Sequence, residues 1–166
     1  MLLFFLIAFA FPAFADRAPL CYLDGGEGDY LLSVAAEGGE EPIAAAPTLS
    51  ALAASLPEEA TLCFRGVEGD EMSLSGRYLL CGSLSLRGAL TVEGGRVELA
   101  SLLLSSDAVG LRVKGGEAVM TGGAIRNNTA NAEGGGIRVW HGTVTDRKST
   151  RLNSSHLSTS RMPSSA

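Results

Sequence analysis

The chain has 166 residues, 46% of them apolar, and a formal net charge of −5 at pH 7. Residues 146–166 hold four Lys+Arg and one aspartate, so residues 1–145 alone carry −8. An acidic domain lacks the basic surface that neutralises nucleic-acid phosphates, and DNA and RNA are therefore excluded as expected partners. Between two ends of unusual composition lie about 130 residues, enough for one domain.

The first 15 residues predict export. They carry no charged side chain, run through an apolar core, and end in the small-x-small pattern Ala13-Phe14-Ala15 before Asp16. A secretory signal peptide has an apolar core of this length, whereas a membrane-spanning helix needs about 20 apolar residues. No Lys or Arg precedes the core, and a buried N-terminal strand or helix is the alternative. We expect a signal peptide at residues 1–15 and no transmembrane span in the mature chain.

Residues 16–59 predict a region of N-terminal strands followed by a capping helix. Two short apolar runs, Leu20–Leu23 and Tyr30–Val34, flank an acidic, glycine-rich loop at residues 24–29. Carboxylate oxygens in such a loop can bind calcium, but the loop lacks the Asp-x-Asp-x-Asp spacing of a dedicated site. A turn between two strands is therefore the expected role.

The segment Pro47–Leu56 predicts a short amphipathic helix that stops at Pro57. Its three leucines share one face, and Thr48 or Ser50 can cap its N-terminus. Because it precedes a series of repeats, the helix is well placed to cover the open end of the first repeat. Binding of a partner is the alternative role.

From residue 60 onward, apolar residues alternate and the alternation recurs. Three stretches align, starting 21 and then 26 residues apart: Leu90–Leu99, Leu111–Met120 and Ile137–Thr145. A repeat of about 20–50 residues with period-two apolarity predicts a β-solenoid in which each repeat forms one coil. A single coil buries too little apolar surface to be stable alone. The expected fold is therefore all-β, a stacked parallel solenoid over residues 60–145.

Paired glycines mark the same place in successive copies of the repeat. Gly94-Gly95 and Gly115-Gly116 stand where the alternation breaks, and His141-Gly142 stands there in the third copy. A corner that requires a positive φ angle explains this recurrence, because glycine adopts positive φ without a steric penalty. These four paired glycines are the expected structural corners.

Three cysteines follow the signal peptide, and an exported protein can keep disulfides. Cys63 and Cys81 are 18 residues apart, close to one coil. Neighbouring strands lie about 4.7–4.9 Å apart, which is compatible with the Cα separation of a disulfide, about 4.4–6.8 Å. A Cys63–Cys81 bridge competes with a Cys21–Cys63 bridge and with cysteines that only fill the core. No cysteine or histidine spacing supports a metal site.

Residues 122–128 carry two short motifs, GGAI at residues 122–125 and IRNN at residues 125–128. The first is similar to the GGAI tetrapeptide of polymorphic outer-membrane-protein repeats, although the companion Phe-x-x-Asn element is absent. The region of residues 60–145 thus resembles right-handed parallel β-helix proteins of bacterial surfaces, with a pectin lyase-like fold. The resemblance implies that Asn127 or Asn128 lies at a coil corner and hydrogen-bonds to the backbone or to neighbouring rungs. N-glycosylation at this site is the alternative.

Catalysis is not expected in these residues. A glycoside hydrolase needs two converging carboxylates, and a polysaccharide lyase needs calcium-binding acids with a basic residue. The acids of the repeats are instead scattered along the sequence: Asp70, Glu93, Glu98, Asp107 and Glu117. The active coils of such an enzyme would lie beyond residue 145.

Two features of the repeats concern their surface. Glu93 and Lys114 occupy equivalent positions in successive copies, which predicts a stacked pair of opposite charges. Trp140 and His141 lie on the last copy and are the candidates for a glycan-binding face.

The last 21 residues differ in composition from the rest, with seven serines and no glycine. Residues 146–156 and 160–166 back-translate into segments that resemble a common high-throughput sequencing adapter. We therefore expect a non-native, disordered tail at residues 146–166 and a solenoid truncated near Thr145. A basic, serine-rich tail that binds anionic partners is the alternative.

These expectations combine into an exported bacterial β-solenoid, secreted or on the cell surface, with an adhesin-like or structural role and no cofactor. Its partner would be a host or cell-surface glycan or protein. The alternative is the N-terminal fragment of a β-helix polysaccharide lyase or glycoside hydrolase.

Overall fold

The computed structural model describes residues 18–25, 29–129 and 135–147. The expected signal peptide and all but two residues of the expected tail lie outside these ranges. The described residues form mostly β-strands and one short helix. No helix within them is both long and apolar enough to cross a membrane.

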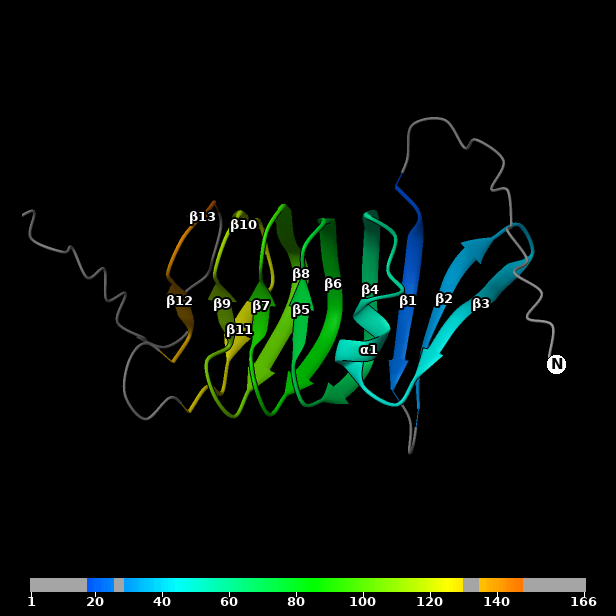
Figure 1. Cartoon of the computed structure of the whole chain (residues 1–166), viewed down its shortest axis with the longest axis horizontal. Coiled ribbons are helices and arrows are strands. Elements are labelled where there is room, and N and C mark those ends of the chain that lie inside the picture. Colours follow the sequence, from blue (N-terminus) through cyan, green and yellow to red (C-terminus); the bar gives the residue numbers. More distant parts are fainter. Residues whose placement is uncertain (1–17, 26–28, 130–134, 148–166) are drawn as a thin grey trace, which may run out of the picture.

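Two parallel sheets wind around a common core and form a β-solenoid of about three turns (Figure 1). In each turn a long strand of sheet A is followed by a corner and a short strand of sheet B. The long strands are β4 (Glu59–Gly69), β6 (Arg77–Leu86) and β8 (Arg96–Ser106). The short strands are β5 (Met72–Leu74), β7 (Leu90–Val92) and β9 (Leu111–Val113). The fold is thus the parallel β-solenoid that the repeats predict.

Four shorter strands extend both sheets beyond these turns. Sheet A continues with β10 (Glu117–Met120), β11 (Ala124–Arg126) and β13 (Thr143–Asp146), and sheet B with β12 (Ile137–Val139). Both β10 and β11 pair with β8, so together they take the place of one long strand. The outer strand β13 pairs with β10.

The aligned copies of the repeat stack in register, as their apolar pattern predicts. Leu90 pairs with Leu111, which pairs with Ile137. Inward-facing side chains therefore form columns that run through successive coils. One such column is fully or almost fully buried and consists of Cys21, Leu62, Leu80, Leu99 and Met120. Each coil covers the apolar residues of the next, which is what stabilises the stack.

The long strands bend at a corner of their own, where backbones of adjacent coils approach closely. Gly82 and Gly123 have φ angles of 93° and 79°, in the region that favours glycine. A Cβ at Gly123 would collide with the backbone of Leu102, and one at Gly82 with the backbone of Phe64. The second glycine of the GGAI motif, Gly123, is therefore required for steric reasons, because it forms the bend between β10 and β11.

The N-terminal region adds an antiparallel extension to sheet A. Strand β1 (Leu20–Gly25) pairs in parallel with β4 and antiparallel with β2 (Tyr30–Ala36), so the two predicted strands are present and paired. A third strand, β3 (Gly39–Ala46), pairs with β2 and was not predicted. Its charged residues and Pro42 do not alternate with apolar ones, and proline is tolerated there because β3 is the outer strand.

An arginine ties this extension to the first coil. The Arg65 guanidinium, on β4, pairs with Asp24 on β1 and with Glu40 on β3. It also lies over the ring of Tyr22, with Cζ 4.7 Å from the ring centroid. The hydrogen bonds to Asp24 and then to Glu40 raise the pKa of Arg65, so it stays charged.

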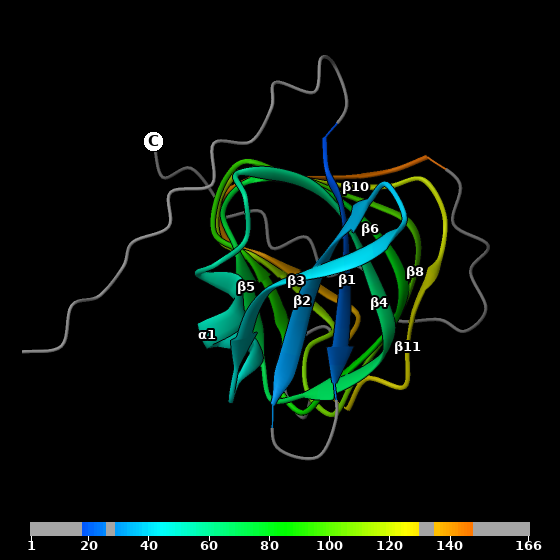
Figure 2. The ribbon, with the colours of Figure 1, turned by 90° about the vertical axis from the view of Figure 1, so that its right-hand side faces the viewer.

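The single helix covers the end of sheet B. Helix α1 (Leu49–Ala53) is shorter than predicted, and the Thr48 hydroxyl accepts a hydrogen bond of 3.1 Å from the backbone N–H of Ala51, which caps it. Leu49 and Leu52 are buried in the core. The helix lies beside β5, the terminal strand of sheet B (Figure 2). It thus shields apolar residues that no further strand of the sheet covers.

Candidate functional site

The predicted corner glycines differ in how strictly the structure requires them. Gly95 and Gly116, the second of each pair, have φ angles of 75° and 74°. A Cβ at Gly116 would collide with the carbonyl oxygen of Gly95, directly below it, and Gly142 continues the stack with a φ of 134°. Gly94 has open space around it, whereas a Cβ at Gly115 would lie 2.6 Å from the Glu93 carbonyl oxygen. These positions shape the coil and bring no side chain to a site.

The cysteines divide between the two faces of sheet A. Cys63 and Cys81 are register partners on adjacent strands, with Cα atoms 4.7 Å apart, and form a disulfide. Cys21 is a free thiol in the core, and its burial raises its pKa. The alternative Cys21–Cys63 bridge is not formed. Cys21 pairs with Leu62 and points inward with it, so Cys63, the next residue, points to the opposite face.

The two asparagines directly follow β11. Asn127 is exposed and has a φ of 57°, a left-handed conformation that asparagine tolerates. Asn128 is half-buried, and its Oδ1 is buried without a hydrogen-bond partner among the described residues. The hydrogen bond from this corner to a neighbouring rung is therefore not made through that oxygen.

Charged side chains on the outer surface pair across coils. Lys114 Nζ donates a hydrogen bond of 2.9 Å to Glu93, which confirms the predicted pair. Arg96 and Glu117, also on adjacent coils, are 2.6 Å apart. These half-exposed pairs stabilise the stacking modestly, and both carboxylates are engaged in them.

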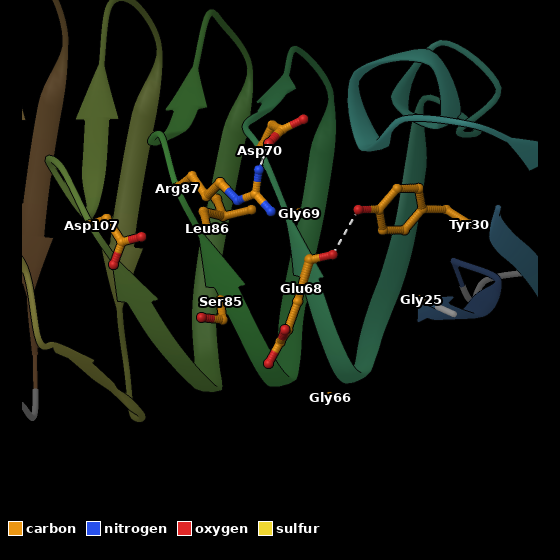
Figure 3. Close-up of a pocket in the computed structure, with 10 residues that line it drawn as sticks. All are labelled: Gly25, Tyr30, Gly66, Glu68, Gly69, Asp70, Ser85, Leu86, Arg87 and Asp107. Carbon is orange, nitrogen blue, oxygen red and sulfur yellow. Dashed lines mark hydrogen bonds and ion pairs between the residues drawn. The ribbon is translucent and has the colours of Figure 1, made fainter. Parts of the chain in front are cut away.

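A groove of about 640 Å³ runs along one side of the solenoid, at the corner between sheet A and sheet B (Figure 3). Its lining comes from the hairpin and from three successive coils. The lining residues are Gly25, Tyr30, Gly66, Glu68, Gly69, Asp70, Ser85, Leu86, Arg87 and Asp107.

Three charged residues at this corner belong to one column. Asp70, Arg87 and Asp107 each follow the last residue of a long strand, and backbone hydrogen bonds Arg87 N–H to Gly69 and Asp107 N–H to Leu86 keep them in register. Arg87 lies between the two aspartates and forms a 3.5 Å ion pair with Asp70 (Figure 3). The acids that are scattered in sequence are thus partly gathered in space.

Tyr30 closes the end of the groove nearest the hairpin. Its hydroxyl donates a hydrogen bond of 2.7 Å to the backbone carbonyl of Glu68, which joins β2 to β4 (Figure 3). Two glycines leave space around it: a Cβ at Gly25 would lie 3.2 Å from the Tyr30 ring, and a Cβ at Gly69 would collide with the Leu49 side chain and lie 3.1 Å from the Tyr30 hydroxyl oxygen. Further along, the Ser105 hydroxyl donates a 3.1 Å hydrogen bond to Ser85.

The predicted glycan-face residues lie elsewhere, in the turn after β12. Trp140 and His141 are both exposed. Trp140 is joined by two cations that the sequence analysis does not single out, Arg112 and Arg138, whose Cζ atoms lie 5.5 and 4.8 Å from its ring centroid. Both arginines are the second residue of an aligned copy, and this equivalence is the signal from which the cluster could be found.

Charge is separated along the axis of the solenoid. Residues 18–25 and 29–76 contain ten Asp+Glu and one arginine, a net charge of −9. Residues 77–129 and 135–147 contain five Asp+Glu and eight Lys+Arg, a net charge of +3. Since coils are stacked in sequence order, the end with the hairpin is acidic and the opposite end is basic (Figure 1).

The described residues contain no group of three or more His, Cys, Asp or Glu side chains arranged to hold a metal ion. A scan against protein-family models finds no match, and searches of curated proteins and of solved structures find none either.

Proposed function

We propose that this chain is an exported bacterial surface solenoid with an adhesin-like role, which binds an extended glycan or protein segment along the groove. The observation that carries the proposal is the lining of the groove. Its polar groups come from three coils at matching positions, so a linear ligand parallel to the axis meets hydroxyl, carboxylate and guanidinium groups in series. The apolar start of the chain supports export, and the GGAI motif supports a bacterial surface protein.

An enzyme is the second candidate, in the form of the N-terminal part of a polysaccharide lyase or glycoside hydrolase. Asp70 and Asp107 are two rungs apart, or about 9.5 Å between Cα atoms at the usual strand spacing. Inverting glycosidases separate their carboxyl groups by about 6.5–9.5 Å, a distance that two aspartate side chains at this Cα spacing can reach. However, Arg87 lies between the two, and the Asp70 side chain is 73% exposed. A general acid is normally shielded from water, so we favour binding over catalysis.

The test is a binding screen of the purified chain against glycan and peptide panels, with variants that block the groove by volume. Ser85→Tyr places a large ring on its lining, and we expect it to weaken binding at least tenfold. Ser83→Tyr is the matched control, because Ser83 is exposed on the same strand, two residues earlier, and does not line the groove. Folding of both variants is checked by circular dichroism.

The outcomes separate the two candidates. Loss of binding in Ser85→Tyr but not in Ser83→Tyr supports the groove as the binding surface. Equal affinity of the two variants, or no ligand in either panel, contradicts it. Release of shorter saccharides from the glycan panel, abolished by Asp70→Asn or Asp107→Asn, would support the enzyme instead.

A further inference from the structure

We propose a second binding site, formed by Arg112, Arg138 and Trp140, that takes the oxyanion of an acidic glycan: a sulfate or carboxylate carried on a sugar ring. The site lies at the sheet B end of the basic half of the molecule and shares no residue with the groove. It goes beyond the proposed function, because it names another surface and a ligand charge.

The two arginines stand directly above one another. Arg112 on β9 and Arg138 on β12 are register partners, and their neighbours along β9, Leu111 and Val113, are fully buried, so Arg112 lies on the outer face. Like charges opposite each other on adjacent strands destabilise a sheet. The ring of Trp140 offsets part of this repulsion, since both guanidinium groups lie within cation–π distance of it.

One donor of the cluster lacks an acceptor. Arg112 Nε is buried, and no hydrogen-bond partner for it is present among the described residues. A buried donor without an acceptor is unfavourable, so a ligand that draws the Arg112 guanidinium toward the surface and accepts a hydrogen bond from it relieves this cost. Planar guanidinium groups bind sulfate and carboxylate through paired hydrogen bonds, which a single ammonium group cannot reproduce.

The surroundings favour an anion. Two residues after the column of the arginines along each coil, Glu93, Lys114 and Trp140 occupy equivalent positions on three successive coils. Lys114 therefore lies beside Trp140, and the Glu93 carboxylate is already paired with Lys114 at 2.9 Å. Trp140 is 46% exposed although both guanidinium groups lie over its ring, so the uncovered part of the indole is the apolar surface for a sugar ring. Charge and shape together indicate an acidic saccharide more than a free inorganic ion.

The experiment uses Trp140 as its own reporter, because it is the only tryptophan of the chain. The full-length protein is titrated with a heparin-derived oligosaccharide, with an oligogalacturonate, and with a neutral dextran of equal length, and tryptophan emission is recorded. We expect a saturable change with at least one acidic saccharide and none with dextran. Tighter binding of the first assigns a sulfate, and tighter binding of the second a carboxylate.

Variants then locate the site. Arg138→Gln is expected to weaken binding at least tenfold, and Arg112→Lys, which keeps the charge but loses the planar group, at least threefold. Arg77→Gln removes the same charge from an exposed position on sheet A and is expected to change the affinity less than twofold. Ser85→Tyr keeps this site intact, so its result distinguishes failure here from failure of the groove.

Three results would overturn the proposal. They are an unchanged emission spectrum at saturating concentrations of both acidic saccharides, an equal response to dextran, and equal losses in Arg138→Gln and Arg77→Gln. The last would show that the net charge attracts the ligand without a defined site.

Discussion

Gly95 and Gly116 occupy corners where the carbonyl oxygen of the coil below takes the space of a side chain. Both also have φ near 75°, where a Cβ is strained. Close contact with the coil below and a positive φ therefore both require glycine at this position, which explains why glycine recurs there in the repeat.

Gly116→Ala is expected to destabilise the fold by about 1–3 kcal/mol, because the new Cβ meets both constraints. Gly94→Ala is the control: it has open space and is expected to stay within about 0.5 kcal/mol of the parent chain. Urea denaturation followed by circular dichroism measures both. Equal losses would contradict the stacked corner.

Among the elements, β4 and β6 are joined covalently as well as by hydrogen bonds. Removal of the bridge by Cys63→Ser/Cys81→Ser is expected to lower the free energy of unfolding by about 3 kcal/mol, since the bridge closes a loop of 18 residues. Dithiothreitol should destabilise the parent chain equally and leave the double variant unchanged. A further loss in the double variant would mean that Cys21, its one remaining cysteine, forms a disulfide between two molecules.

The helix α1 protects the end of sheet B through its two buried leucines. Leu52→Asp places a charge against this apolar end and is expected to destabilise the chain by more than about 3 kcal/mol. Ala51→Asp puts the same residue on the exposed side of the helix and is expected to change stability by less than about 0.5 kcal/mol. Thermal unfolding with light scattering records both stability and association; a mild effect of Leu52→Asp would argue against a capping role.

At the scale of the whole molecule, each coil contacts only its neighbours, so stability is expected to vary along the axis. Amide hydrogen exchange should be slowest in β6 and β8, which have a partner on both sides, and faster in β12 and β13, which have one. Leu80→Ala should accelerate exchange over several coils, whereas Val144→Ala should affect mainly β10 and β13. Uniform exchange in all strands would indicate a single cooperative unit instead.

The stacking register was predictable because parallel pairing repeats the same side-chain orientation in every coil. The alignment of Leu90, Leu111 and Ile137 in sequence is the alignment of β7, β9 and β12 in space. The spacing of Cys63 and Cys81 indicated the bridge for the same reason. The sequence could not choose between this bridge and Cys21–Cys63, because that choice depends on the face of the sheet to which each cysteine points.

The groove was not predictable in the same way, because corners differ in length from coil to coil. Asp70, Arg87 and Asp107 are 17 and 20 residues apart, so no fixed period brings them together in the sequence. Their proximity depends on where each long strand ends. Strand β3 was missed because an outer strand buries little and needs no apolar alternation.

The separation of charge along the axis gives the molecule a permanent electric dipole. A charged surface exerts a torque on such a body over roughly a Debye length, about 8 Å at physiological ionic strength, before any contact forms. Facing an anionic surface, the coils of residues 77–129 and 135–147 are expected to turn toward it and the acidic hairpin to turn away. The long side that carries the groove then stands upright and open to the medium, the orientation in which the ligand that we propose for the groove would approach from the side.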